Sequence, residues 1–200
     1  MSEPSKRGRG RPRSIDRGEA VRIAMCAWWA DGTAGVSLNE ISRRMGLSKS
    51  SVYREFGGED GLMAAALAQY RELSAVPLLA LFERAVPPRE LLTLVVRAAT
   101  AERGLPAGCF FTNLRLRRSR LGDATNALVD AMIAERRAVF ARWFETVRNR
   151  GEAHPSLSTQ DAARYLDAQL HLILLRLASG DAPDDIREDA TFALQALLAA

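Results

Sequence analysis

Hydrophobic residues recur every three or four positions along most of the chain, which is the period of an amphipathic α-helix. No segment alternates convincingly between apolar and polar residues, as a half-buried strand would, and no internal repeat is visible. The chain is therefore predicted to be all-α. Helices are expected over residues 16–31, 37–45, 48–56, 59–82, 89–103, 123–150, 159–179 and 184–199.

Residues 37–56 read as two short helices joined by a tight turn. Ser37 and Glu40 fit a capping box, in which each side chain meets a free backbone N–H group at the start of a helix. Gly46 can adopt a positive φ and end that helix. Ser48 then fits the N-cap of the second helix.

Each of these two helices has an apolar side, and the second also has a polar outer face. Ile41 and Met45 of the first helix and Val52 and Phe56 of the second recur at helical spacing and are expected to face inward. Long, hydrogen-bonding and cationic side chains remain outside, as a helix that reads the major groove of DNA requires. They are Lys49, Ser50, Ser51, Tyr53 and Arg54. The alternative is a solvated helical hairpin.

Two flanking segments bear on that choice. In the preceding helix, Trp28 is expected to fill the core behind the hairpin rather than to form a binding platform. The chain begins with a Pro-, Gly-, Ser- and Arg-rich stretch, predicted to be disordered, in which Arg9-Gly10-Arg11-Pro12 resembles an AT-hook. Such a segment inserts its arginines, here Arg9 and Arg11, into a narrow minor groove. The alternative is a solubilising tail or a nonspecific phosphate binder.

The distribution of charge supports a polyanionic partner. The net charge is only +4, and 48% of the 200 residues are hydrophobic, enough for a sizeable core. Residues 1–56 contain 11 Lys and Arg against 6 Asp and Glu, whereas the remaining 144 residues contain 17 against 18. The positive excess therefore accompanies the helical pair.

Other sequence features favour a soluble cytoplasmic protein without catalytic chemistry. The N-terminus lacks the apolar region of a signal peptide. The longest apolar run, 76–82, is too short to span a bilayer and contains Pro77, which is expected to kink or end its helix. Cys26 and Cys109 imply no disulfide framework, and Cys109, beside two phenylalanines, is expected to be buried and inert rather than a redox sensor.

Motifs for nucleotide binding, metalloprotease activity and thiol chemistry are missing from the sequence. His154 and His171 have no Cys or acidic neighbours at ligand spacing, so neither a metal site nor an enzyme is predicted. His154 precedes Pro155 in an expected loop. His171 lies on a largely apolar helix, where it is expected in the core or at an interface, the alternative being a donor into a pocket.

The pattern resembles the TetR family of bacterial transcriptional regulators, closely over residues 16–67 and more weakly beyond, at Gly108–Asn113. The residues that stand at the family's spacing are Ala24, Trp28, Gly32, Ser37, Ile41, Gly46, Leu47, Ser48, Lys49, Tyr53, Phe56 and Leu62. The resemblance implies a homodimer of about nine helices per chain, with three N-terminal helices that bind a palindromic double-stranded DNA operator. It also implies a larger C-terminal domain that binds an unidentified small-molecule inducer and dimerises.

By position, the resemblance assigns phosphate contacts to Lys49 and Tyr53, and places Ser50 and Ser51 nearest the base edges. Arg54 stands where the family often has a histidine on the DNA backbone. Ser37 and Ser48, at the helix starts, complete the predicted DNA-binding set with Arg9 and Arg11. Family members commonly have a lysine at the start of the fourth helix, where this chain has Glu59 followed by Asp60. These acids suit the helix dipole but repel phosphate, so that contact is not expected here.

The C-terminal half shows the apolar surface that dimerisation needs. Residues 159–179 are apolar on more than one side, which predicts contact both with the core and with a second subunit. The alternative is one large monomeric core. The residues predicted at the dimer interface are Leu166, Leu170, Ile173, Leu177, Leu194 and Leu197.

An inducer site is expected in the interior of the C-terminal domain, mostly apolar and aromatic, and suited to an uncharged or weakly polar ligand. The candidate residues are Phe110, Phe111, Asn113, Met132, Phe140, Trp143 and His171. Each of them is also a candidate for ordinary core packing.

The sequence thus predicts three parts: a disordered basic arm at 1–15, a helix-turn-helix domain at 16–58, and a ligand-binding and dimerisation domain at 59–200. The predicted function is a sequence-specific DNA-binding transcriptional regulator, a ligand-responsive repressor that a small-molecule inducer releases from DNA. The alternatives are an activator that uses the same DNA face, and a small-molecule-binding helical protein without regulatory DNA binding.

Overall fold

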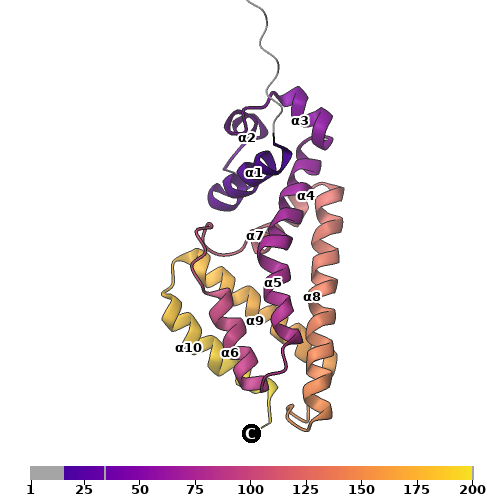
Figure 1. The fold of residues 1–200 in the computed structure, drawn as a ribbon, viewed down its shortest axis with the longest axis vertical. Coiled ribbons are helices and arrows are strands. Elements are labelled where there is room, and N and C mark those ends of the chain that lie inside the picture. Colours follow the sequence, from indigo (N-terminus) through magenta and orange to yellow (C-terminus); the bar gives the residue numbers. More distant parts are fainter. Residues whose placement is uncertain (1–15, 34, 200) are drawn as a thin grey trace, which may run out of the picture.

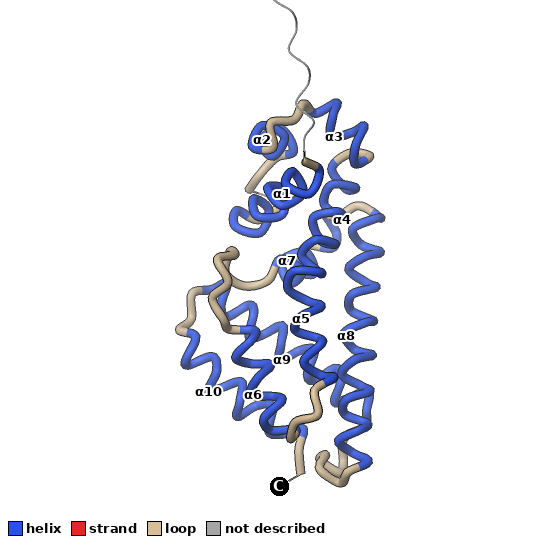
Figure 2. Tube along the Cα trace, in the orientation of Figure 1, coloured by secondary structure: helices blue, strands red, loops and turns tan. Residues whose placement is uncertain are grey.

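The structure is a computed structural model that describes residues 16–33 and 35–199. Every regular element of the described residues is helical (Figure 2). The first group of helices is α1 (Arg17–Asp31), α2 (Leu38–Arg44) and α3 (Lys49–Phe56). The rest are α4 (Glu59–Tyr70), α5 (Val76–Leu79), α6 (Pro88–Ala99), α7 (Phe110–Leu116), α8 (Asp123–Asn149), α9 (Thr159–Ser179) and α10 (Pro183–Leu194). No described helix is long and apolar enough to cross a membrane.

The helices form two parts that share α4 (Figure 1). Helices α1, α2 and α3 gather at one end, and α4 leads from them into the larger part. There α8 packs against both α4 and α9, and α6 and α10 cover the other side of α9. The helix-turn-helix end and the larger helical body therefore match the predicted all-α organisation.

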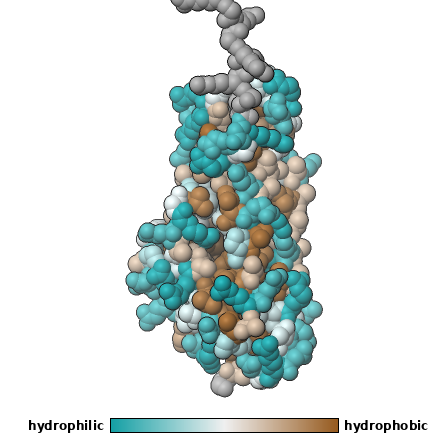
Figure 3. All heavy atoms as spheres, in the orientation of Figure 1, coloured by the Kyte–Doolittle hydropathy of each residue, from teal (hydrophilic) through white to brown (hydrophobic). Residues whose placement is uncertain are grey.

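The apolar core of the molecule extends into the small end. Trp28 of α1 is fully buried, as are Ile41 of α2 and Val52 of α3. Leu62 of α4 is also fully buried and belongs to the same core. The prediction that Trp28 fills the core is confirmed. The space-filling view shows mostly hydrophilic atoms over this end and hydrophobic atoms gathered lower down, over the middle of the molecule (Figure 3).

Pro77 does not end its helix. A π-helical turn, Arg71–Ala75, separates α4 from α5, and Pro77 lies in the first turn of α5. Helical backbone then continues through a 3₁₀ turn at Ala80–Glu83. A π-turn shifts the hydrogen-bond register by one residue, which accommodates a proline that lacks an N–H and crowds the preceding turn. Of the two expected effects of Pro77, a kink or an end of the helix, the structure excludes the end, and the regular α-helical hydrogen bonding is instead interrupted at 71–75.

Two predicted helices are too long at their C-terminal ends. Helix α6 ends at Ala99 because Thr100 leaves the helical conformation, and residues 101–108 form a loop instead of a further turn. Helix α10 ends at Leu194 and tightens into a 3₁₀ turn, Gln195–Leu197. In both segments the apolar pattern continues past the point at which the backbone leaves the α-helix.

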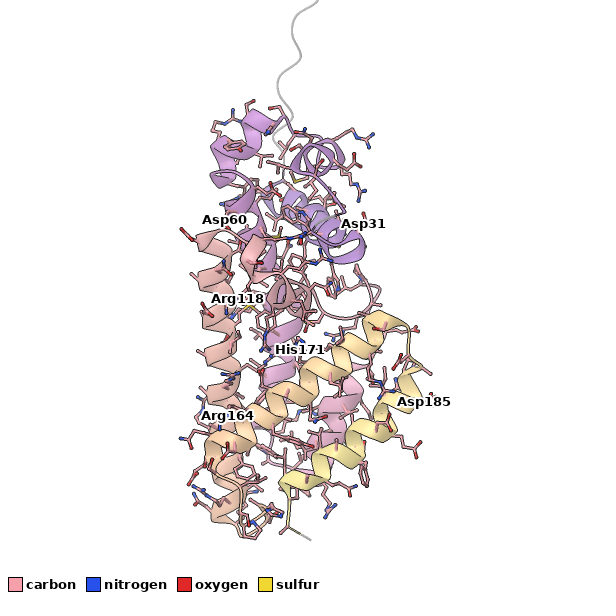
Figure 4. All side chains as sticks on the ribbon, turned by 180° about the vertical axis from the view of Figure 1, so that it is seen from behind. Asp31, Asp60, Arg118, Arg164, His171 and Asp185 are labelled. Carbon is pink, nitrogen blue, oxygen red and sulfur yellow. The ribbon has the colours of Figure 1, made fainter. Side chains whose placement is uncertain are left out.

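The Asp60 side chain ties the first turn of α4 to the start of α8. Asp60, in the first turn of α4, accepts hydrogen bonds from the backbone N–H groups of Ala124 (2.9 Å) and Thr125 (3.1 Å). The hydroxyl of Thr125 also donates to the Asp60 carboxylate, at 2.6 Å. The N-cap position of α8 is Gly122, which has no side chain, so Asp60 caps α8 from a different helix (Figure 4).

These bonds act on the charge of Asp60. Burial raises the pKa of the carboxyl, but the hydrogen bonds from Thr125 and Ala124 outweigh it, and the pKa lies below its ordinary value. A lowered pKa means that the folded chain favours the ionised form. The stabilisation is therefore complete above the ordinary pKa of about 3.9 and is lost as the pH falls through the lowered pKa.

We expect Asp60→Asn to lower the free energy of unfolding by about 1 kcal/mol at pH 7, because an amide cannot accept both backbone N–H groups. Chemical denaturation measures this. Glu59→Gln is the matched control, since exposed Glu59 makes no hydrogen bond to a described side chain or loop. The difference between Asp60→Asn and wild type should shrink below about pH 4. Equal effects of the two variants would contradict the capping role.

Candidate functional site

The turn between α2 and α3 is held by backbone and capping hydrogen bonds. The Ser37 hydroxyl accepts from the N–H of Glu40 at 3.3 Å and caps α2. Gly46 has a φ of 68°, and the N–H of Leu47 donates to the carbonyl of Ser42 at 2.9 Å. A left-handed residue at this position lets the chain reverse within one turn, as the sequence predicts for Gly46.

The predicted capping box is only half formed. The carboxylate of Glu40 does not return to Ser37 but pairs with Arg43 and Arg44 on its own helix. Arg44 also bonds Asp31 at 2.9 Å, which ties α2 to the end of α1. Two cations compete for this carboxylate and outweigh one backbone N–H, because charge-assisted hydrogen bonds are the stronger ones.

The start of α3 is organised around Ser48. Its hydroxyl accepts from the N–H of Ser51 at 3.1 Å, as an N-cap does. It also shares hydrogen bonds with the hydroxyls of Ser50 (2.8 Å) and Ser51 (2.9 Å). Ser48 is thus a structural residue of this surface, and Ser50 and Ser51 are held in fixed orientations beside it.

Three longer side chains project from the outer face of α3. The Tyr53 side chain is 54% exposed, and its ring lies over Gly58, where a Cβ atom would come within 3.1 Å of the ring. Arg54 is exposed and donates to Glu55 at 3.1 Å. Lys49 is exposed and forms no ion pair with a described residue. These three residues all belong to α3, which lies at the free end of the molecule (Figure 1).

Most of the positive excess of this domain lies outside the described residues. Residues 16–56 contain 6 Lys and Arg against 5 Asp and Glu, whereas residues 1–15 contain 5 against 1. Arg22, Arg43, Arg44 and Arg54 are all ion-paired. The predicted minor-groove contacts, Arg9 and Arg11, belong to the segment outside the described residues and stay predictions.

A cavity of about 430 Å³ lies where the two parts of the chain meet. Helix α1 contributes Trp29, α4 contributes Tyr70, and residues 99–108 form most of the remaining wall. The other lining residues are Ser74, Leu174, Leu177, Asp181 and Pro183. This volume is within the range of sites for small organic ligands.

Two polar groups of this wall differ in their hydrogen bonding: the Trp29 indole has a partner and the Ser74 hydroxyl has none among the described residues. The Trp29 indole Nε1 donates to the carbonyl of Ala107 at 3.1 Å, a direct bond between α1 and the loop before α7. The hydroxyl of Ser74 is buried and has no hydrogen-bond partner among the described residues. A buried hydroxyl without a partner costs free energy that a bound ligand can recover.

Tyr70 of this wall is bonded to a buried thiol, that of Cys109, which does not itself line the cavity. The Tyr70 hydroxyl and the Cys109 Sγ are hydrogen-bonded at 2.9 Å, and the Tyr70 ring meets Trp29 edge-on at 5.1 Å. Burial, followed by the neighbouring Cys109, raises the pKa of Tyr70 well above its ordinary value. The phenol is therefore neutral at physiological pH. Cys109 is 2% exposed, so the prediction of a buried thiol is confirmed.

Comparisons with known proteins agree on one family. Residues 23–66 match the family model described as bacterial regulatory proteins, tetR family. The HTH-type transcriptional repressor ComR of Escherichia coli (strain K12) is 29% identical over 168 residues, which make up 81% of this chain and 79% of ComR. The DNA-binding part of the chain carries the TetR-family pattern, and the similarity to a repressor named in this way extends over most of the chain. The resemblance seen in the sequence is confirmed.

Solved TetR-family structures share the fold along nearly the whole chain. The TetR family transcriptional regulator CifR, solved with a 26-bp double-strand operator DNA, superposes with a TM-score of 0.79 at 22% identity, covering 93% of this chain and 99% of CifR. The reduced form of E. coli NemR superposes with a TM-score of 0.75 at 18% identity, covering 91% of this chain and 96% of NemR. At these identities the likeness establishes the fold.

The family pattern and this chain differ at the start of α4. The acids that replace the usual lysine have separate roles: Glu59 is exposed in the first turn, and Asp60 caps α8. The helix dipole of α4 explains only part of that choice. The TetR-family sequence pattern gave no signal for the capping role, because the two partners are 64 residues apart.

The residues predicted to bind an inducer are not those that line the cavity at the domain boundary. Phe110, Phe111, Met132 and Phe140 are buried in the core, and Trp143 lines a smaller cavity of about 290 Å³ near the far end of α8. Asn113 and His171 are partly buried. The aromatic residues at helical spacing pack in the hydrophobic core. The boundary cavity is lined mainly by a loop whose sequence has no periodic pattern.

Five of the six residues predicted at the dimer interface are buried within a single chain. Leu166, Leu170, Ile173, Leu194 and Leu197 are at most 2% exposed, and Leu177 is partly buried. The chain's own core covers these five side chains, and the position of the dimer interface stays a prediction. The large apolar side chains left exposed on these helices are Leu172 (47%) and Phe192 (81%). A helix apolar on two sides buries its stronger stripe first.

Proposed function

We propose that this chain is a sequence-specific DNA-binding transcriptional regulator that reads DNA with α3. The observation that supports this proposal is the arrangement of Lys49, Tyr53 and Arg54 on the outer face of a short helix. The oriented hydroxyls of Ser50 and Ser51 lie beside them. A helix that presents such groups at its N-terminal half fits the major groove, with cations on phosphates and short polar groups toward base edges. Such a regulator acts in the cytoplasm, where the bacterial chromosome lies.

Repression is the form of regulation that the relatives support. ComR and BdcR of E. coli, 29% and 28% identical to this chain, are both named transcriptional repressors. BdcR matches over 109 residues, 55% of its own length. CifR was solved on operator DNA. We infer that this chain likewise occupies an operator and blocks transcription until it is released.

A dimer is the form that a palindromic operator requires, because two α3 helices must enter successive major grooves about 34 Å apart. Figure 4 shows α9 and α10 side by side on the face opposite to that of Figure 1. Leu172 and Phe192 project from these two helices into solvent. We infer that they form the centre of the subunit interface, in place of the buried leucines.

We infer that a small-molecule effector binds in the cavity at the domain boundary. The wall contains Trp29, which belongs to the DNA-binding part, and a loop that belongs to the regulatory part. A ligand that separates the Trp29 indole from Ala107 changes the orientation of α1 relative to the body, and with it the spacing of the two α3 helices. The half-apolar, half-polar wall fits a largely uncharged compound with at least one hydrogen-bonding group for Ser74.

The DNA-binding proposal predicts that Lys49→Ala weakens operator binding uniformly across sequences and lowers the slope of log affinity against log salt by about 1. Genome-wide mapping of bound DNA supplies the operator, and fluorescence anisotropy measures the affinity. Arg97→Ala, an exposed arginine on α6, is the matched control and should leave both quantities unchanged. Activation of the adjacent gene would contradict repression alone, whereas ligand binding with no DNA affinity at low salt would contradict the whole proposal.

The dimer proposal predicts that Phe192→Glu converts the protein to a monomer, because a charge cannot be buried unpaired at the centre of an interface. Size-exclusion chromatography with light scattering measures the mass. Leu73→Glu changes a similarly exposed apolar residue, 48% exposed, on the π-turn after α4. It should remain a dimer. A dimeric Phe192→Glu protein would place the interface elsewhere.

The effector proposal predicts that Ala99→Leu, which adds bulk to the cavity wall, weakens binding of the neutral dye N-phenyl-1-naphthylamine by about tenfold. Dye fluorescence, which rises in apolar sites, measures binding. Ala98→Leu is the control, since Ala98 neighbours the cavity residue but does not line it. If both variants bind the dye like wild type, the boundary cavity is not the ligand site.

A further inference from the structure

Three arginines surround one buried carboxylate where α7, α8 and α9 meet. Asp167 of α9 forms ion pairs with Arg136 of α8, with Arg115 of α7 (3.4 Å) and with Arg137 of α8 (3.6 Å). We call Arg115, Arg136 and Arg137 the arginine cluster. None of the four residues lines the boundary cavity, so this is a separate feature of the regulatory part.

The charges of the arginine cluster do not balance. Asp167 is the one acidic partner found for all three guanidinium groups among the described residues, so two positive charges are left over. Elsewhere on α8 and α9, Arg148 pairs with Glu145 and Arg164 pairs with Asp161, and Arg142, which has no acidic partner among the described residues, is exposed to solvent. The buried excess of positive charge is therefore a property of this site.

Burial makes that excess costly. The Asp167 side chain is 3% exposed, that of Arg136 is 10% exposed and that of Arg115 is 21% exposed. Charges removed from water lose hydration and need opposite charge close by. The pKa of Arg115 is lowered by burial, and repulsion from Arg136 and Arg137 adds to this against the attraction of Asp167. The surroundings of Arg115 thus disfavour the charge that an arginine always carries.

The guanidinium group of Arg136 also lacks a hydrogen-bond partner at one nitrogen. Its Nε atom is buried and has no partner among the described residues. Part of the deficit is met by the ring of Phe111, which lies 4.9 Å from the Arg136 guanidinium and 5.7 Å from that of Arg115. The quadrupole of a ring face attracts a guanidinium more weakly than the full charge of a carboxylate does. It does not replace a carboxylate.

His171 lies one turn beyond Asp167 on α9 (Figure 4). Its pKa is lowered, first by burial and then by Arg115 and Arg136, with Asp167 acting in the opposite direction. The ring is therefore neutral at physiological pH and adds no further positive charge. Its Nδ1 lies 3.5 Å from the hydroxyl of Thr112, a weak contact that leaves imidazole hydrogen bonding available to another group.

We propose that the arginine cluster is a binding site for a small anion, a carboxylate or phosphate group that supplies the negative charge missing beside Asp167. Arg115 and Arg137, 21% and 44% exposed, form the side that an anion reaches from solvent. Guanidinium groups hold such anions through paired, charge-assisted N–H···O bonds. A purely structural tie between the three helices would need only one cation for Asp167, so the surplus cations are the feature that calls for a ligand.

The test is the unfolding temperature of the full chain, without DNA, titrated with sodium acetate or sodium phosphate at constant ionic strength set by sodium chloride. A site predicts a rise that begins near the dissociation constant, reaches about 3–6 °C at roughly ten times that concentration, and then grows with the logarithm of the anion concentration. Such a rise with acetate alone indicates a carboxylate site, and such a rise with phosphate alone indicates a phosphate site. Because DNA is left out, the result is independent of the proposed DNA binding.

Variants separate the site from a general salt effect. Arg115→Gln should abolish the anion-dependent rise, whereas Arg142→Gln, which changes an exposed arginine on α8, should keep it. Asp167→Asn removes the competing negative charge and should lower the anion concentration at which the rise begins about tenfold. If that variant does not fold, the Arg115 and Arg142 pair still decides. A rise in Arg115→Gln equal to that of wild type, or no rise with either anion beyond that in sodium chloride, overturns the proposal.

Discussion

The bond between Asp60 and the start of α8 is the constraint on which the two-part design depends. Helix α4 belongs to both parts: its first turn follows the predicted DNA-reading helix, and its last turn lines the boundary cavity with Tyr70. A helix shared in this way transmits orientation only if its first turn is fixed to the body. Asp60 does this by accepting two backbone N–H groups of α8, which also satisfies a helix end that Gly122 cannot cap.

The two parts use charge in opposite ways. In the DNA-binding part the described cations are mostly paired with acids, so the surface offers Lys49 and few other unpaired charges, and residues 1–15 hold most of the excess. Solvent-exposed pairs of this kind contribute little stability but hold side chains in place. In the regulatory part the unpaired charge is buried, around Asp167, where it is costly. Exposed charge can be neutralised by a polyanion on contact, whereas buried charge requires a ligand small enough to reach it.

The sequence predicted what depends on neighbours along the chain. The caps at Ser37 and Ser48, the turn at Gly46 and the buried Trp28 follow from local pattern, and all are present. The errors concern choices between partners far apart in sequence. Periodicity marked Leu166 and Leu170 as apolar but could not say whether the core or a second subunit buries them, and the chain's own core did so first. The cavity wall comes from a loop, residues 101–108, with no periodic signal, and its contact with Trp29 spans 78 residues.

Helix α7 connects the two candidate ligand sites, the boundary cavity and the arginine cluster. The loop that enters it carries Gly108 of the cavity wall and Cys109, whose Sγ meets Tyr70, while its far end carries Arg115 of the arginine cluster. The same short helix packs against α1 and α4 on one side and α8 and α9 on the other. Packed interiors shift between discrete arrangements rather than deform continuously, so a ligand that moves α7 must also move what it touches. Helices α1 and α4 both contact the DNA-binding part, so in the proposed mechanism a ligand at either site acts on α3 through the position of α7.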